Sequence, residues 1–126
     1  LFIAKLIKSL TERKKMNLYE SVFVFSGNLT EKLANDKIEK YEEIVKKSGG
    51  KTLKKEYWGL KSLAYKIKKN TKGHYFLVNF NTGHESIKEL ENKFKIDEES
   101  IRFLNLSIDK VTEEPSFMMK KYNDEK

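Results

Sequence analysis

Three short segments of the chain place mostly apolar side chains at every second position, on one face, which predicts β-strands. The segments are Leu18–Phe25, His74–Phe80 and Ile101–Ile108. A longer segment, Lys51–Ile67, alternates imperfectly between lysine and large apolar side chains. Gly59 lies inside it, where a glycine often marks a β-bulge. The pattern therefore predicts four strands, of which the longest is bent.

Two further stretches repeat apolar residues every three or four positions, which is typical of amphipathic helices. These residues are Ala34, Ile38, Tyr41 and Val45 in the first stretch, and Ile87, Leu90 and Phe94 in the second. Thr30 precedes the first stretch as a typical N-cap, and Gly49 and Gly50 follow it as a typical stop. We expect the second helix to begin near Gly83.

The order of the elements is β-α-β-β-α-β, because Asn70–Gly73 has the composition of a hairpin turn between the two middle strands. This order is that of the ferredoxin-like split β-α-β arrangement. Right-handed crossovers then place both helices on one face of a four-stranded antiparallel sheet. The predicted fold class is α+β, and the other face of the sheet stays open as a binding surface.

The length of 126 residues indicates one domain, which we place at residues 16–113. Residues 1–15 form a basic leader before Met16, the first methionine. Two explanations of the leader remain open, namely translation that begins at Met16 and a transit-like extension. Residues 114–126 are a charged tail with no predicted element, and either disorder or folding on a partner would explain that composition.

The chain contains no cysteine, which excludes disulfides, cysteine-based zinc sites and thiolate catalysis. It also contains no run of 18 apolar residues, so neither a membrane-spanning helix nor a membrane partner is expected.

The formal net charge of +7 suggests a polyanionic partner, and the charge is unevenly distributed. Residues 1–15 carry a net +4, and residues 51–74 hold eight lysines against one acid, Glu56. Concentrated lysine is what phosphate-backbone binding uses. Lysines on a hairpin edge also prevent pairing with another chain, so the charge alone leaves both explanations open.

The sequence matches the known motifs of nucleotide-binding, RNA-binding and metal-binding sites poorly. Gly50-Lys51-Thr52 ends like a phosphate-binding loop, but Val45 replaces the required glycine and the triplet opens a strand instead of a helix. Lys72–Phe80 agrees only partly with the stacking pattern of RNA-recognition motifs. The two histidines have no carboxylates at a metal-ligand spacing. We therefore expect no catalytic residue, no metal site and no enzyme activity.

The segment Gly59–Lys68 resembles the diagnostic stretch of a known family, that of the sixth protein of the bacterial small ribosomal subunit. In the family this stretch reads glycine, any residue, a basic residue, a polar residue, leucine, alanine or serine, tyrosine, any residue, isoleucine, and a polar or basic residue. Nine of the ten positions fit, and Ser62 departs because the family usually has a larger polar or charged side chain there. Smaller agreements are Tyr19-Glu20, Asn28-Leu29, Ile87–Phe94 and Ile101-Arg102. The resemblance covers residues 16–113.

The resemblance implies a ferredoxin-like fold and a structural role without enzymatic activity, cofactor or small-molecule substrate. It implies binding to the central domain of 16S rRNA jointly with the eighteenth protein of the small subunit, as a heterodimer. The expected location is therefore cytoplasmic, in the small ribosomal subunit, and the choice between a bacterial and an organellar ribosome stays open.

The residues expected to bind RNA are Lys61, Lys66, Lys68, Lys69 and Arg102. Arg102 matches the family's arginine at the start of the last strand, and a guanidinium can hold a phosphate through two hydrogen bonds. A surface ion pair would also explain that arginine. The residues expected at the partner interface are Tyr57, Trp58 and Tyr65, with core packing as the alternative for Tyr65.

Two other functions remain open on the sequence. One is a stand-alone RNA-binding module that binds RNA tightly without a partner, supported only by the partial match at Lys72–Phe80. The other is a ferredoxin-like oligomerisation or small-ligand domain, which would dimerise through the sheet face and ignore RNA.

Overall fold

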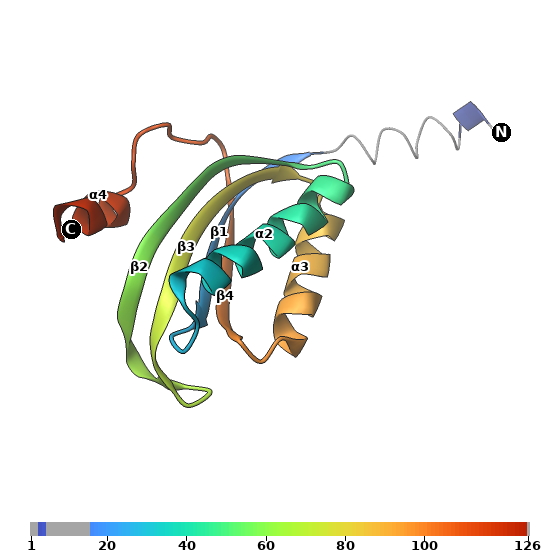
Figure 1. The fold of residues 1–126 in the computed structure, drawn as a ribbon. Helices are drawn as coiled ribbons and strands as arrows, with labels where there is room; N and C mark the ends of the chain where they lie inside the picture. Colours follow the sequence, from blue (N-terminus) through green and yellow to red (C-terminus); the bar gives the residue numbers. More distant parts are fainter. Residues whose placement is uncertain (1–2, 5–15, 126) are drawn as a thin grey trace.

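The computed structural model describes residues 3–4 and 16–125 of the chain (Figure 1). The elements are β1 (Asn17–Ser26), α2 (Glu31–Lys47), β2 (Lys51–Ile67), β3 (Asn70–Thr82), α3 (His84–Ile96), β4 (Ser100–Ile108) and α4 (Phe117–Glu125). The predicted leader, residues 1–15, lies outside the described residues apart from positions 3 and 4. In the described part of the chain, no helix has the length and apolar character that a membrane span requires.

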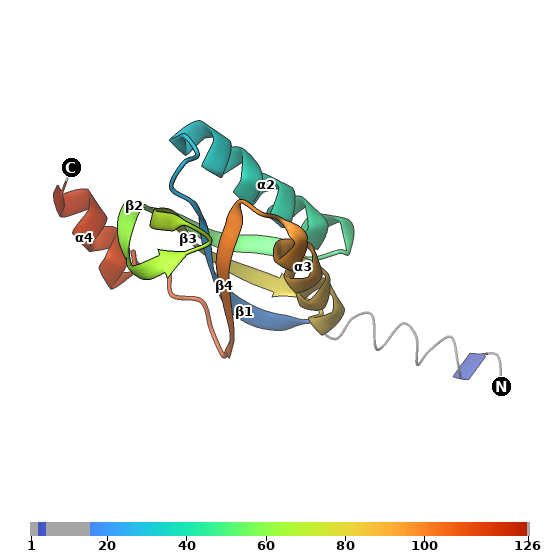
Figure 2. The ribbon, with the colours of Figure 1, turned by 90° about the horizontal axis from the view of Figure 1, so that it is seen from below.

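The four strands form one antiparallel sheet in the order β2-β3-β1-β4. Helices α2 and α3 cover one face of this sheet, as the views in Figures 1 and 2 show. The predicted ferredoxin-like arrangement is therefore confirmed. The first strand of the chain lies in the interior of the sheet, and the two edges are β2 and β4.

An aromatic cluster fills the space between the sheet and the two helices. Phe23 on β1 is fully buried, and its ring centroid lies 4.9–6.4 Å from those of five other rings. These rings belong to Phe25, Tyr41, Phe80, Phe94 and Phe103. Every element of the sheet-helix sandwich except β2 contributes one of them, and Tyr57 of β2 packs against the cluster. Ring pairs at such distances add stabilisation beyond the area they bury.

The hairpin between β2 and β3 turns at Lys68-Lys69, so the predicted turn at Asn70–Gly73 is wrong. Lys68 and Lys69 have φ values of 47° and 66°, as the two central residues of a type I′ turn require. Ile67 and Asn70 pair across the turn, and β3 already begins at Asn70. Gly73 therefore lies within β3, where a Cβ atom would come within 2.6 Å of Val24.

The hydrogen bonds of Asn70 explain why asparagine, which favours turns, stands at the start of β3. Its side chain is buried and donates to the carbonyl oxygens of Ile67 and Lys68 at 3.2 and 3.0 Å. Its Oδ1 atom accepts a hydrogen bond of 2.6 Å from the hydroxyl of Ser26 at the end of β1. Asn70 thus closes the turn and fixes the hairpin to the middle of the sheet.

The predicted bulge at Gly59 is confirmed. Gly59 has a φ of 96°, and the register between β2 and β3 shifts between Tyr57 and Gly59. A left-handed backbone conformation at this point favours glycine. The hairpin bends strongly, and Figure 1 shows β2 and β3 curving together around the helical layer.

Residues beyond 113, for which the sequence predicts no element, contain the helix α4. Ser116 caps it, because its Oγ atom accepts from the Met119 amide at 3.1 Å and its carbonyl from the Lys120 amide at 3.0 Å. The helix lies on the side of the sheet away from α2 and α3 (Figure 1). The face of the sheet that the sequence leaves open is therefore covered in part, along β2.

Candidate nucleic-acid interface

The tip of the β2-β3 hairpin reaches the start of β4, although β2 and β4 are opposite edges of the sheet (Figure 2). The Lys68 ammonium donates to the Ser100 carbonyl at 2.9 Å. The Arg102 guanidinium donates to the Tyr65 hydroxyl and lies over the Tyr65 ring, 5.5 Å from its centroid. The curvature of the hairpin thus joins two regions that are far apart in the sheet order.

The basic residues predicted to bind RNA carry charge that no carboxylate of residues 16–123 neutralises. Lys66, Lys68, Lys69 and Arg102 are exposed, and Lys61 is half-buried. Within residues 16–123, the lysines that form ion pairs are Lys37, Lys54, Lys55 and Lys93. Arg102 contacts Tyr65 and forms no ion pair with the described carboxylates, so the surface ion pair expected as an alternative is not observed. We call Lys61, Lys66, Lys68, Lys69 and Arg102 the basic tip.

On the helical side of the sheet, Lys37 of α2 pairs with two carboxylates of the segment between α3 and β4. The Lys37 ammonium lies 2.5 Å from the Asp97 carboxylate and 3.3 Å from that of Glu99. Burial acts to raise the pKa of Asp97, but the hydrogen bond from Lys37 and the Glu99 amide outweigh it and hold that pKa below its usual value. The charge of Lys37 is thus neutralised, whereas that of the basic tip is not.

The structure separates the three residues predicted at the partner interface. Tyr65 is 60% exposed and belongs with Arg102 at the basic tip, so core packing does not account for it. Tyr57 is half-buried, with its ring centroid 4.9 Å from that of Phe76. Trp58, also half-buried, donates from Nε1 to the Glu56 carboxylate at 2.9 Å. Tyr57 and Trp58 therefore lie together, away from Tyr65.

His74 and Tyr57 form a buried hydrogen-bonded pair that supports the fold. The Nε2 atom of His74 lies 2.7 Å from the Leu29 carbonyl, which can only accept, so we assign the proton to Nε2. The Nδ1 atom then accepts from the Tyr57 hydroxyl at 2.8 Å. Burial, with the nearby charge of Glu31, raises the pKa of Tyr57 to about 12, so this hydroxyl remains a donor. The pair links β2, β3 and the loop before α2.

Glu56 is a structural residue whose role the sequence analysis missed. Its side chain is only 5% exposed and accepts from the Ser116 amide at 2.9 Å and the Ser116 hydroxyl at 2.5 Å. Lys54, 3.6 Å from Glu56, donates to the carbonyl oxygens of Thr112 and Glu114. We call Lys54, Glu56 and Ser116 the tail clamp. The one signal in the sequence is that Glu56 is the single acid among the eight lysines of residues 51–74.

Gly59 completes the docking of α4 on β2. A Cβ atom at this position would lie 2.8 Å from the ring of Tyr122 on α4. The Tyr122 ring also packs edge-on against Tyr57, with 5.7 Å between the centroids. Glycine is thus required here both for its backbone conformation and for the close approach of α4.

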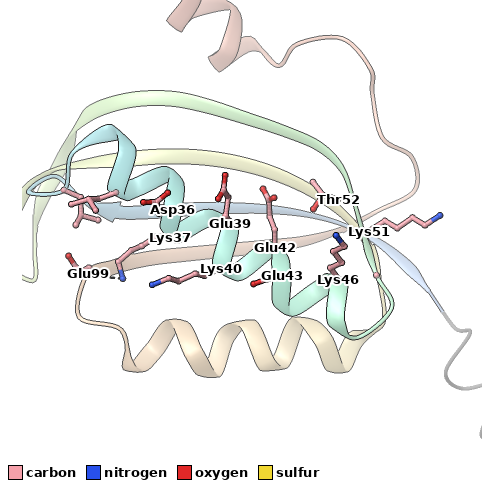
Figure 3. A pocket seen from close by; sticks show the side chains of 13 residues that line it. Asp36, Lys37, Glu39, Lys40, Glu42, Glu43, Lys46, Lys51, Thr52 and Glu99 are labelled. Atoms are coloured by element: carbon pink, nitrogen blue, oxygen red, sulfur yellow. Dashed lines mark ion pairs between the residues drawn. The ribbon is translucent and has the colours of Figure 1, made fainter.

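A cavity of about 1200 Å³ lies on the helical side, between α2 and the start of β2. Figure 3 shows charged side chains of both signs along it. Five carboxylates and four lysines line this cavity, and Glu42 among them pairs with Lys55 at 3.1 Å. So balanced a lining does not favour an anionic ligand. Within the described residues no three histidine, aspartate or glutamate side chains could hold a metal ion.

Comparison with known proteins agrees with the sequence resemblance. The family model "Ribosomal protein S6" matches residues 18–107. The chain is 38% identical over 109 residues to small ribosomal subunit protein bS6 of Parvibaculum lavamentivorans, covering 86% of this chain and 70% of that protein. It is 39% identical over 110 residues to small ribosomal subunit protein bS6 of Rickettsia bellii, covering 87% of this chain and 92% of that protein.

The fold is also shared with a solved structure, the crystal structure of 30S ribosomal protein S6 from Thermotoga maritima. The TM-score is 0.68 at 28% sequence identity, covering 88% of this chain and 97% of that chain. Fold and relatives together define a structural protein of the small ribosomal subunit and not an enzyme. The chain belongs to the ribosomal protein S6 family. The resemblance carried by Gly59–Lys68 is confirmed.

The tail clamp predicts that Glu56→Gln loosens α4 without unfolding the sheet. A neutral amide replaces the carboxylate that accepts two hydrogen bonds from Ser116, and hydrogen bonds to a charged group contribute about 1.5–3 kcal/mol each. Amide hydrogen exchange at residues 117–122 should accelerate by about tenfold or more, while exchange in β1 and β3 stays unchanged. Glu113→Gln, at an exposed carboxylate of the same tail, is the matched control. Unchanged exchange in Glu56→Gln would contradict the clamp.

Acid should release the tail for the same reason. Burial acts to raise the pKa of Glu56, but hydrogen bonds from Ser116 and Trp58 and the charge of Lys54 hold it below the ordinary value of 4.5. The ionised carboxylate stabilises the docked tail, and this stabilisation is complete at pH values above the pKa that Glu56 has when the tail is undocked. It is lost as the pH falls through the lower pKa of the docked state. Fluorescence of Trp58, the single tryptophan, should report that acid transition, and Glu56→Gln should lack it. The same transition in both proteins would assign it to another group.

Proposed function

We propose that the chain binds the central domain of 16S rRNA in the small ribosomal subunit, jointly with the eighteenth protein of that subunit. The observation that carries the proposal is the basic tip, where the hairpin meets β4 and unpaired cations from both elements lie together. Lysine and arginine near phosphates release condensed counterions, which is the main source of affinity for a nucleic-acid backbone. The relatives are small ribosomal subunit proteins, which supports an RNA partner of this kind.

The conformation of the turn supports a role for its charge. Lys68 and Lys69 both have positive φ values, a conformation that costs residues with a Cβ atom roughly 1–2 kcal/mol each. Asparagine and glycine adopt it at lower cost and are the usual residues of such turns. Two lysines at these positions place positive charge at the outermost point of the hairpin, where stability alone would favour other residues.

A second protein partner is supported by the modest charge of the domain. Residues 16–126 carry a net charge of only +3, so the domain offers few phosphate contacts by itself. On the face opposite α2 and α3, Leu104 and Leu106 of β4 are 56% and 64% exposed, beside the half-buried Val22. This apolar surface and the exposed Tyr65 are available to a protein partner. Because α4 lies against Tyr57, a partner that reaches Tyr57 and Trp58 also contacts α4.

A binding titration tests the function as a whole. The full 126-residue chain is titrated against a central-domain 16S rRNA fragment, with and without the eighteenth protein, over a series of salt concentrations. We expect tight binding only when the partner is present, with affinity that falls steeply as salt rises. Tight binding without the partner would favour a stand-alone RNA-binding module. Self-association without RNA binding in either condition would favour the oligomerisation domain.

The basic tip predicts a specific loss of salt dependence. Replacing Lys66, Lys68 and Lys69 with alanine should lower the slope of log K against log salt by up to about three units, because each phosphate contact contributes about 0.7–0.9. The turn should survive, since lysine and alanine bear similar backbone constraints at positive φ. The matched control replaces Lys40, Lys46 and Lys47, three exposed lysines of α2, and removes the same charge. Equal slopes for the two variants would remove the basic tip from the interface.

A further inference from the structure

A cavity lies beside the basic tip, between the second half of α3 and the start of β4, and has a volume of about 560 Å³. Its lining residues are Lys68, Glu91, Phe94, Lys95, Ser100, Ile101, Arg102 and Phe103. Three of these side chains are cationic and one is anionic. The cavity thus differs from the larger one beside α2, where acids outnumber lysines.

Two of the three cations are held in place by uncharged groups. Lys68 donates one hydrogen bond to the Ser100 carbonyl, which leaves its other N–H groups for a ligand. Arg102 is oriented by the hydroxyl and the ring of Tyr65. Neither cation is neutralised by a carboxylate of residues 16–123, so both line the cavity with their charge unpaired there. Cations oriented in advance lose less freedom when an anion binds.

Lys95 is the third cation, and neither the sequence pattern nor the basic tip includes it. It lies in the last turn of α3 with Lys93. Lys93 pairs with Glu89, one turn earlier, at 4.0 Å. Lys95 has Glu91 at the same spacing, yet the two form no ion pair, and both line the cavity. The side chain of Lys95 is thus available to a bound anion.

We propose that this cavity binds one backbone phosphate of the RNA, with Lys68, Lys95 and Arg102 as its ligands. The proposal rests on the proposed function and adds a defined phosphate site, with a residue of α3, to the basic tip. Arg102 can supply two parallel hydrogen bonds, and the two lysines supply point charges from either side. The rings of Phe94 and Phe103 line the same cavity. A volume of this size is within the range of small-ligand pockets, roughly 300–1,000 Å³, so a phosphate fits with part of its nucleotide.

The proposal predicts opposite effects on RNA affinity when Lys95 and Glu91, which line the same cavity, are each replaced by glutamine. Lys95→Gln should weaken binding to the rRNA fragment and lower the salt slope by about one unit, in the presence of the partner protein. Glu91→Gln should strengthen binding by about threefold or more, because a like charge is removed from the anion site. If Lys95 only stabilises the end of α3, Lys95→Gln should lower thermal stability and leave the slope of log K against log salt unchanged. That result would overturn the proposal.

Matched controls separate the cavity from a general effect of charge. Lys88→Gln removes an exposed lysine two turns earlier on the same face of α3, about 10 Å away at 1.5 Å per residue. Glu39→Gln removes an exposed carboxylate of α2. Both should leave the slope and the affinity unchanged. If Lys88→Gln and Lys95→Gln have equal effects, or Glu91→Gln and Glu39→Gln do, the cavity is not a phosphate site.

A second measurement does not depend on the rRNA. The chain has two arginines, Arg13 and Arg102, so the Nε–H signal of Arg102 can be assigned by NMR with an Arg102→Lys variant. Titration with inorganic phosphate, at ionic strength matched with chloride, should shift this signal in the full chain and not in Lys95→Gln. No phosphate-specific shift would overturn the site even if the chain binds rRNA. If phosphate shifts the signal but Lys95→Gln leaves the salt slope of RNA binding unchanged, the cavity binds free phosphate and the proposal for RNA is overturned. Absence of all rRNA binding would instead reject the proposed function itself.

Discussion

The curvature of the β2-β3 hairpin is the constraint on which both surfaces of the protein depend. It is fixed at one end by the buried hydrogen bond between Ser26 and Asn70 and relaxed in the middle by the bulge at Gly59. Without the bend, the two edge strands would stay separated by β1 and β3, and the hairpin tip could not reach Ser100. The same bulge gives Tyr122 its place against β2. One glycine and one asparagine therefore organise two distant regions.

The protein uses its lysines in two different ways. Lys37 of α2 and Lys54 and Lys55 of β2 pair with carboxylates, and Lys54 also holds the tail through hydrogen bonds to the carbonyl oxygens of Thr112 and Glu114. Lysines near the hairpin turn have no such partners in the described chain. Counting residues of each sign cannot reveal this division, because it arises from which side chains the fold brings within reach. The exposed, unpaired group is the one on which a polyanion can act.

Most of the fold could be predicted from the sequence, since the periodicity of apolar residues reports which side of an element is buried. Phe23 and Ile38 are buried as their spacing predicts. The hairpin turn was misplaced because Asn70–Gly73 has turn composition, while the contact that overrides it, from Ser26, joins residues 44 positions apart. Helix α4 was missed because its nine residues carry little amphipathic pattern and depend on a cap and a clamp from tertiary contacts.

The candidate site was predictable only in part. Charge clustering identified the lysines of the hairpin, and the family resemblance identified Arg102. Neither could show that Tyr65 belongs with Arg102, since their contact depends on the bend. Neither could show that Tyr57 serves His74, because the partner lies 17 residues away on the next strand. Lys95 carries no signal at all in the sequence, where it reads as an ordinary basic residue at the end of a helix.

The interior position of β1 has a consequence for synthesis of the chain. β1 is made first, but both of its neighbours, β3 and β4, are made later, and β4 ends at Ile108. Its segment Leu18–Phe25, rich in β-branched and aromatic residues, lacks its first neighbour until β3 ends at Thr82. It lacks the second until β4 is complete, some 80 residues after β1, which takes roughly 4–16 s at 5–20 residues per second. Exposed strands of this composition tend to pair with other chains. The pairing of the first strand on both sides is thus complete only once the last strand has been made.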